Sequence, residues 1–234
     1  MRTVLVVAAE RRELDGIVAR CRAPARLGWP LDFAAAGELN GQRLLLVANG
    51  PGPRLATQAV EVATAAGPVD VVVSAGLCGG LAPPLRCGDV VVASEVCAPE
   101  TGQNYRAGLP ETARPFRSGP VLSLDRVVSG VEEKRKLAAA GALAVEMESA
   151  GVAAGAAGNG LPFYCVRAVM DGAGEGLKLD FNSMRGRDGR FSRLRILRAA
   201  LARPWVIVPE LMRLRLASRI AARALGEFFA DCRF

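Results

Sequence analysis

Two acidic residues separated by a single position are the feature of this sequence that points most directly to chemistry. Glu146 and Glu148 flank Met147, just before residues 149–157, a run of small residues that favours a helix. In an extended segment, residues two apart point to the same side, so both carboxylates would project together and Met147 would face away. The alternative is a solvated strand end whose acids are favoured by the start of the helix.

A third acid follows an apolar run about twenty residues further along. Residues 163–169 form a nearly continuous apolar run, which predicts a buried strand, and Asp171 and Gly172 follow it closely. Parallel sheets carry their catalytic groups at such strand ends. Taken together, the two signals favour an active site over a solvated surface.

The inventory of residue types narrows the chemistry. The chain has no histidine, which excludes Ser-His-Asp and Cys-His catalytic sets and every zinc site that contains histidine. The six cysteines are scattered without a C-x-x-C pair, and they are predicted to be reduced core thiols of a cytosolic protein. Asp, Glu, Arg and backbone groups remain to carry any reaction, and we predict neither a metal nor a cofactor.

The apolar runs predict one α/β domain that positions these acids. With 234 residues and 51% hydrophobic content, the chain can bury one sizeable core, so a single domain over residues 1–234 is expected, with a basic helical part at 184–234. The expected fold is a three-layer sandwich with a twisted, mixed central sheet flanked by helices. Strands are predicted at 3–9, 43–48, 69–75, 89–94 and 163–169, and helices at 54–66, 127–140 and 149–157.

Four further segments have a local prediction. Residues 50–52 and 76–80 are glycine-rich, follow apolar strands and predict turns whose N–H groups can face a ligand, although such turns are common. The charged cluster 132–136 predicts a solvent-facing helix segment. Residues 103–119 contain several Pro and Gly residues and predict a long loop.

The order of these pieces resembles the nucleoside phosphorylase and nucleosidase superfamily. That family has an acid after the first strand, a Gly-x-Gly turn, a Gly-x-x-Gly-Gly-Leu-Ala-Pro turn, Glu-Met-Glu, and a strand ending in Asp. The matching residues here are Glu10 or Glu13, 50–52, 76–83, 146–148 and Asp171. Over about residues 1–173 the likeness is to methylthioadenosine/S-adenosylhomocysteine nucleosidases, while residues 179–205 look like the hopanoid-biosynthesis branch.

The resemblance implies cleavage of a purine N-glycosidic bond in a 5'-substituted adenosine, with adenosylhopane as the specific candidate. Asp171 would protonate or hydrogen-bond the purine ring nitrogen. Glu148 would hold the ribose hydroxyls and offset the cation that develops on the sugar. Met147 would pack on the sugar, and Glu146 would be a neighbouring structural acid.

The family also has an acid that positions water and a turn that lines the substrate site. The water-positioning acid lies four residues after the alanine that closes the first strand, which favours Glu13 and keeps Glu10 as the alternative. The implied substrate-binding residues of the turn are Gly76, Leu77, Cys78 and Gly79.

Departures from the family pattern favour water over phosphate as the nucleophile. Leu77 and Ser74 stand where phosphate-using relatives have a serine and an arginine, so the anion cradle looks depleted. Phosphate remains the alternative co-substrate, because backbone N–H groups, aided by Arg43 or Arg54, can bind it. Met170 also replaces the serine that usually precedes the catalytic Asp.

Positive charge is concentrated in the tail. The net charge is +7, and residues 184–234 alone hold twelve arginines and four acids, a net charge of +8. Residues 190–202 and 207–229 alternate arginine with apolar residues, which predicts helices with one apolar and one cationic face. They are either ordinary docking helices or an interfacial surface for anionic lipid. In the second case the aromatic residues near the boundary are Trp205, Phe228 and Phe229.

The predicted partners follow from these patterns. Nucleic acid is not expected, since aromatic residues are only 5% and no recognition motif accompanies the charge. Residues 1–9 predict a first strand rather than a signal peptide, and the expected location is cytoplasmic, with peripheral contact at the inner membrane face as the interfacial alternative. The resemblance implies a homodimer that takes a small-molecule or lipid nucleoside.

Four other functions remain open at this stage. Three are enzymatic: methylthioadenosine/S-adenosylhomocysteine hydrolysis, futalosine hydrolysis and phosphorolysis. The fourth is nucleoside or lipid binding without turnover.

Overall fold

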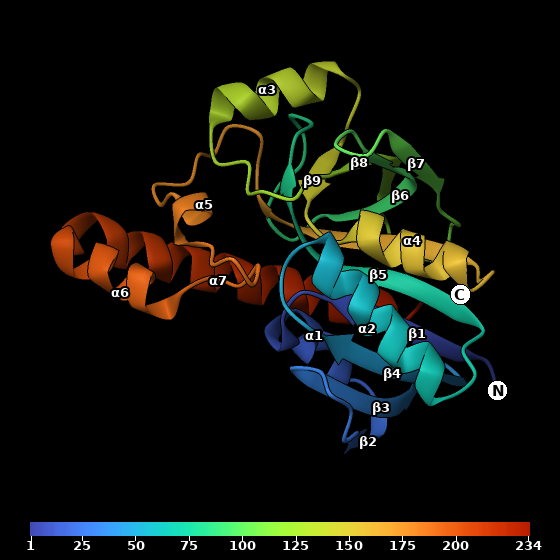
Figure 1. The fold of residues 1–234 in the computed structure, drawn as a ribbon. Helices are drawn as coiled ribbons and strands as arrows, with labels where there is room; N and C mark the ends of the chain where they lie inside the picture. Colours follow the sequence, from blue (N-terminus) through green and yellow to red (C-terminus); the bar gives the residue numbers. More distant parts are fainter.

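A ten-stranded sheet organises the computed structural model, which describes residues 1–234 (Figure 1). The strands are β1 (Thr3–Ala8), β2 (Arg22–Arg26), β3 (Phe33–Leu39), β4 (Gln42–Ala48), β5 (Val71–Gly80), β6 (Val90–Ala98), β7 (Gln103–Arg106), β8 (Arg117–Ser123), β9 (Ala144–Glu146) and β10 (Phe163–Asp171). The helices are α1 (Arg11–Val18), α2 (Pro53–Ala66), α3 (Val131–Ala139), α4 (Ser149–Gly158), α5 (Phe181–Met184), α6 (Arg193–Ala202) and α7 (Pro204–Phe229).

The central strands run parallel, and part of the sheet closes on itself. β1 pairs in parallel with β4 and β5, and β5 pairs in parallel with β10. β10 then pairs with β6, β6 with β8, β8 with β9, and β9 returns to β5, which closes a ring of five strands. Because β1, β4, β5 and β10 are parallel, their carboxyl ends meet at one edge, where open α/β sheets bind ligands.

Helices cover both faces of the sheet, which confirms the predicted three-layer mixed α/β fold. α2 and α4 pack on one face, and α1 and α7 on the other (Figure 1). The continuous apolar run of β1 is fully buried because both its faces are covered. α1 and α7 approach closely at two glycines: a Cβ on Gly16 would collide with the carbonyl of Ala222, and a Cβ on Gly226 with that of Gly16.

Several local predictions were wrong. Residues 76–80 are not a turn but the second half of β5, where pairing with β10 and β9 supplies the hydrogen bonds. The expected loop 103–119 contains β7 and the start of β8. β9 ends at Glu146 and Glu148 adopts a helical conformation, so 146–148 is not one extended segment.

The basic C-terminal part forms a helical hairpin that extends from the body of the fold (Figure 1). The amino-terminal half of α7 packs against α6 and α5 through a small apolar cluster that includes Ile207 and Met184, and the carboxyl-terminal half lies on the sheet. The prediction that Phe228 and Phe229 lie at a lipid boundary was wrong, since both are buried in the main core. Trp205 is 77% exposed. None of the helices combines the length and apolar character needed to cross a bilayer.

Candidate active site

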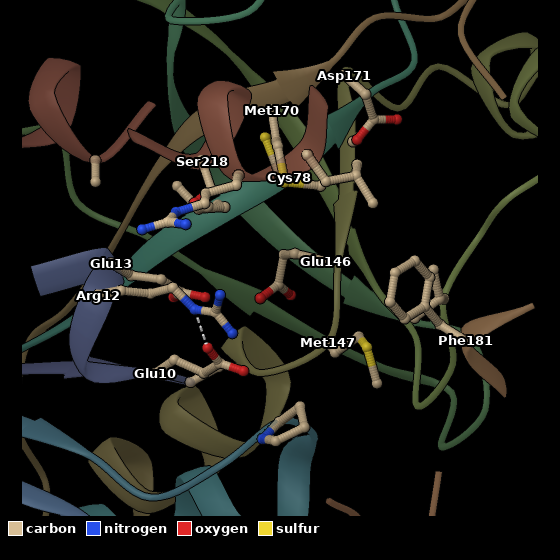
Figure 2. Close-up of a pocket in the computed structure, with 18 of the residues that line it drawn as sticks. Glu10, Arg12, Glu13, Cys78, Glu146, Met147, Met170, Asp171, Phe181 and Ser218 are labelled. Carbon is tan, nitrogen blue, oxygen red and sulfur yellow. Dashed lines mark hydrogen bonds and ion pairs between the residues drawn. The ribbon is translucent and has the colours of Figure 1, made fainter. Parts of the chain in front are cut away.

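A cavity of about 910 Å³ opens at the carboxyl ends of the parallel strands. One end is acidic, and its carboxylates come from α1, β9, the start of α4 and β10 (Figure 2). The other end is mainly apolar and is built from α5, α6, α7 and the segments beside them, although α7 also brings Arg215, Arg219 and Arg223 to the wall. The acids that line the cavity are Glu10, Glu13, Asp15, Glu146, Glu148 and Asp171, and the apolar residues include Leu177, Phe181, Phe191, Ile196, Leu211 and Leu214.

The cavity gathers nearly all the residues that the sequence singled out. Nine of the ten candidate residues line it, although they come from four separate parts of the chain. Gly76 lies just behind the lining. The nine are Glu10, Glu13, Leu77, Cys78, Gly79, Glu146, Met147, Glu148 and Asp171. Met147 lines the cavity as well.

A buried arginine that the sequence analysis missed organises the acidic end. Arg167 of β10 is fully buried; its Nη2 pairs with Glu146 Oε2 and donates to Ser74 Oγ at 2.6 Å and Ser149 Oγ at 2.8 Å. Its Nη1 lies 3.7 Å from Glu148 Oε2. The available signal was an arginine inside an otherwise apolar strand, because a buried charge requires partners.

Glu146 acts within this network rather than toward the cavity. Its Oε2 accepts hydrogen bonds from the backbone N–H groups of Glu148 and Ser149, both at 2.9 Å, and pairs with Arg167, while its Oε1 accepts from the N–H of Ser149 at 3.1 Å. Both carboxylate oxygens therefore have partners from the protein, and the start of α4 is fixed against β10. This placement matches a structural acid.

Glu148 joins the Glu-Met-Glu segment to the glycine turn after β4. Its Oε1 accepts a hydrogen bond from the N–H of Gly52 at 3.1 Å, and Pro51 of the same turn lines the cavity. This N–H group therefore faces a carboxylate of the protein. Burial and the neighbouring Glu146 raise the pKa of Glu148 to about 7, while Arg167 opposes the shift. The carboxyl therefore titrates near neutral pH.

The structure separates the two candidate acids of α1. Glu13 points into the cavity, and its Oε2 is buried without a hydrogen-bond partner. Burial and the nearby charge of Glu148 raise the pKa of Glu13 well above its usual value. Glu10 instead forms an ion pair with Arg12 near the rim (Figure 2). Only Glu13 thus offers a free buried oxygen.

A second buried atom without a hydrogen-bond partner, Nη1 of Arg167, lies beside Glu13 at Gly76, which has no side chain. A Cβ at Gly76 would collide with both Glu13 Oε2 and Arg167 Nη1, so these two atoms flank the same point on β5. Arg167 Nη1 also has no hydrogen-bond partner. Buried polar atoms without partners are rare in folded proteins, and an acceptor beside a donor suits a small polar molecule such as water.

Asp171 is paired with a lysine that does not line the cavity. Asp171 ends β10, is 3% exposed and forms an ion pair with Lys134 of α3, which is itself fully buried. Burial raises the pKa of Asp171, and the positive charge of Lys134 opposes that shift. The prediction that 132–136 faces solvent was wrong for Lys134, because its partner lies 37 residues away in sequence and is invisible to local charge patterns.

The arginines proposed for an anion site are engaged elsewhere. Arg43 lies at the opposite end of β4 from the cavity, and Arg54 donates to the carbonyl of Asp188 at 2.7 Å. Ser74 accepts its hydrogen bond from Arg167, and Leu77 brings only an apolar side chain to the cavity.

Comparison with known proteins places this geometry in a family. The family model described as the phosphorylase superfamily matches residues 30–115 and 106–201. The chain belongs to this superfamily. It is accordingly an enzyme, a nucleosidase or a nucleoside phosphorylase, as the sequence predicted.

Individual relatives agree with the family assignment. The 5'-methylthioadenosine/S-adenosylhomocysteine nucleosidase of Actinobacillus succinogenes is 31% identical over 167 residues, which cover 60% of this chain and 72% of the relative. Two Helicobacter pylori structures share the fold at 18% identity, with 97% of this chain and 95% of each relative covered. They are the 5'-methylthioadenosine/S-adenosylhomocysteine nucleosidase (TM-score 0.71) and futalosine hydrolase (TM-score 0.70).

Proposed function

We propose that the protein hydrolyses the N-glycosidic bond of a 5'-substituted adenosine and releases adenine. The observation that carries this proposal is the convergence of Glu13, Glu148 and Asp171 on one cavity, each from a different element. Bond cleavage places positive charge on the ribose and negative charge on the departing purine. Such a reaction needs an acid at the base, an anion at the sugar and a group that activates water.

Each carboxyl has a role that its surroundings support. Asp171, whose pKa is raised by burial, donates its proton to the purine as the C–N bond breaks. Glu148 accepts hydrogen bonds from the ribose hydroxyls and offsets the developing cation. Water between Glu13 Oε2 and Arg167 Nη1 adds to the anomeric carbon, and its proton passes to Glu13. Water thus supplies OH to the sugar and Asp171 supplies H to the base.

Water is favoured over phosphate by the carboxylate beside Gly76 and by the lack of free side chains to hold an anion. An acceptor, Glu13 Oε2, lies beside Gly76, and a carboxylate repels a phosphate dianion. The side chains of Ser74 and Arg54 are both committed to protein partners. Phosphorolysis is therefore the less favoured hypothesis. Measuring whether adenine release depends on phosphate distinguishes it from hydrolysis.

The apolar end of the cavity supports a large hydrocarbon 5'-substituent, with adenosylhopane as the candidate. Six apolar side chains line that end, and the whole cavity, at about 910 Å³, is of the size that encloses a drug-sized ligand. A methylthio group would leave most of this wall without a partner. Methylthioadenosine, S-adenosylhomocysteine and futalosine are the alternative substrates.

The α6–α7 hairpin supports peripheral contact with anionic lipid, which would suit such a substrate. Eight of the ten large exposed hydrophobic residues lie on these two helices. On α7 they recur every three or four residues and form one stripe, and Arg215 and Arg219, beside that stripe, line the cavity. The eight are Leu194, Leu197, Leu201, Trp205, Val208, Met212, Leu216 and Ile220.

Substrate and nucleophile are tested together by measuring adenine release from adenosylhopane and from methylthioadenosine in detergent, with and without phosphate. The expected result is phosphate-independent release that is faster from the lipid nucleoside. Faster cleavage of methylthioadenosine would overturn the lipid assignment, and dependence on phosphate would overturn hydrolysis. No release from either, with futalosine also intact, would contradict the proposed function.

The lipid contact is tested by sedimentation with phosphatidylglycerol-containing vesicles. Trp205→Ser with Met212→Ser should weaken binding severalfold, whereas Leu109→Ser, at an exposed leucine outside the hairpin, should not. Light scattering on the same variants tests the expected homodimer. Loss of dimer mass without loss of vesicle binding would assign the stripe to a second copy of the chain and overturn the lipid proposal.

A further inference from the structure

Lys134 has an environment that its neighbours on α3 do not share. Glu132, Arg135 and Lys136 of the same helix are exposed, and Arg135 pairs with Glu132. Lys134 is fully buried. Taking an ammonium group out of water costs several kcal/mol unless its charge and its protons are all partnered. The burial of this one lysine therefore requires a specific set of acceptors.

That set is built around Asp171. Lys134 Nζ pairs with Asp171 Oδ2 and donates to the carbonyls of Gly172 and Glu175, both at 2.9 Å. All three ammonium protons thus go to the end of β10 and the segment that follows it. Lys134 does not line the cavity, whereas Asp171 does. The lysine therefore does not contact a ligand directly, and the group it holds at the cavity wall is the carboxylate of Asp171.

We propose that Lys134 is a positioning residue for the reaction: it holds Oδ2 of Asp171 from behind, turns Oδ1 toward the purine, and stabilises the carboxylate formed when Asp171 gives up its proton. The inference rests on the proposed function. The O–H bond of Asp171 breaks and an N–H bond forms on the purine. The negative charge left on Asp171 is then paired with the Lys134 ammonium.

Two further charged groups face this pair. Glu175, in the segment after β10, acts against ionisation of Asp171, while Arg213 of α7 favours it. These two residues pair with each other at 2.8 Å, and Arg213 also pairs with Glu210, so their net effect on the aspartate is small. Lys134 is the group in direct contact and provides the largest electrostatic effect that favours the ionised form of Asp171.

The charge of Lys134 predicts the direction in which the pH profile of kcat/KM shifts when the lysine is replaced. Removing the ammonium by Lys134→Met raises the pKa of Asp171 further, because burial is then unopposed. The acid form persists to higher pH, so the alkaline limb of kcat/KM moves to higher pH, while kcat on the plateau falls by about tenfold or more, as for loss of acid strength. Lys134→Arg, which keeps the charge, should leave the limb near its wild-type position.

The experiment compares wild type, Lys134→Met, Lys134→Arg and Asp171→Asn, each checked for folding by circular dichroism. Lys136→Met is the matched control, since it makes the same change at an exposed site of the same helix. Adding Lys134→Met to Asp171→Asn should cost no further activity, because the lysine acts through the aspartate. An unmoved alkaline limb in a folded Lys134→Met enzyme overturns the inference, as does an additive loss in the double variant.

Failure of the proposed function gives a different result. If Asp171→Asn keeps wild-type adenine release, the acid role of Asp171 is wrong. If Asp171→Asn is inactive while Lys134→Met matches wild type in rate and pH profile, only the role of Lys134 is wrong. If Lys134→Met does not fold, Lys134→Arg and the double variant, which removes both buried charges, still supply the comparison.

Discussion

Glu13 Oε2 and Arg167 Nη1 lie on either side of Gly76, and neither atom has a hydrogen-bond partner in the protein. One is an acceptor from α1 and the other a donor from β10. An unpartnered acceptor beside an unpartnered donor marks a point that suits a small polar reactant. The first two predictions follow from this pair.

Gly76→Ala should abolish most activity while the protein stays folded. The added methyl would occupy the point that Glu13 Oε2 and Arg167 Nη1 now share, so one or both side chains must move. We expect kcat to fall by about 10²-fold, as expected for displacement of positioned groups. The measurement is adenine release by protein whose folded fraction is determined by urea titration. A loss of activity no larger than the loss of folded protein would contradict the prediction.

Glu13→Gln and Glu10→Gln should have different effects. Glutamine at position 13 cannot take a proton from water, so kcat should fall by about 10²- to 10⁴-fold, the usual share of a general base. Glu10 pairs with Arg12 near the rim, so its replacement should change kcat by less than a few-fold. Steady-state kinetics on both variants decide the matter; the reverse ranking would assign the base to Glu10.

Activity should fall as the pH drops below about 7. Burial raises the pKa of Glu148 to about 7 and that of Glu13 above its usual value, and both roles require the ionised form. Folding stability should show the opposite trend: a raised folded-state pKa means that ionisation is disfavoured in the native protein, so stability decreases as the pH rises toward 7. The pH profile of kcat/KM tests the first point, and an acidic limb near the ordinary glutamate pKa would contradict it.

Arg167→Met should destabilise the fold strongly. It would leave Glu146 buried at 5% exposure without its counter-charge, and removal of one partner from a buried pair costs about 3–5 kcal/mol. Adding Glu146→Gln should restore part of the loss, because the stranded charge disappears. Urea unfolding of the single and double variants measures this coupling. Equal stability of Arg167→Met and wild type would show that the network is dispensable for folding.

The sequence predicted the buried parallel strands well because both their faces are covered, which requires continuous apolar runs such as β1 and β10. It missed β9 because three residues carry no readable periodicity. It missed β2 because Arg22–Arg26 is exposed and contains proline, so no apolar alternation marks it. The glycine run in β5 locally predicts a turn, because the strands that pair with it come from residues far away in sequence.

The sequence predicted the acids of the site because they belong to short family motifs. It did not predict the residues that pair with them. The partners of Arg167 and Lys134 come from other elements of the fold, and only tertiary packing brings them together. Arg167 has one signal in the sequence, because it is a charged residue within an apolar strand. Lys134 has no such signal, because the four residues around it in the sequence are charged as well.

The division of the cavity wall has a consequence for how this enzyme can change. The carboxylates proposed to meet the base and sugar come from the sheet and the elements at its edge, while much of the apolar wall comes from α5, α6 and the amino-terminal half of α7. Mutations in the α6 arm of the α6–α7 hairpin can therefore alter which nucleoside is accepted while the carboxylates keep their positions. Exchange of that arm between relatives offers a modular way to redirect the proposed reaction toward new substrates.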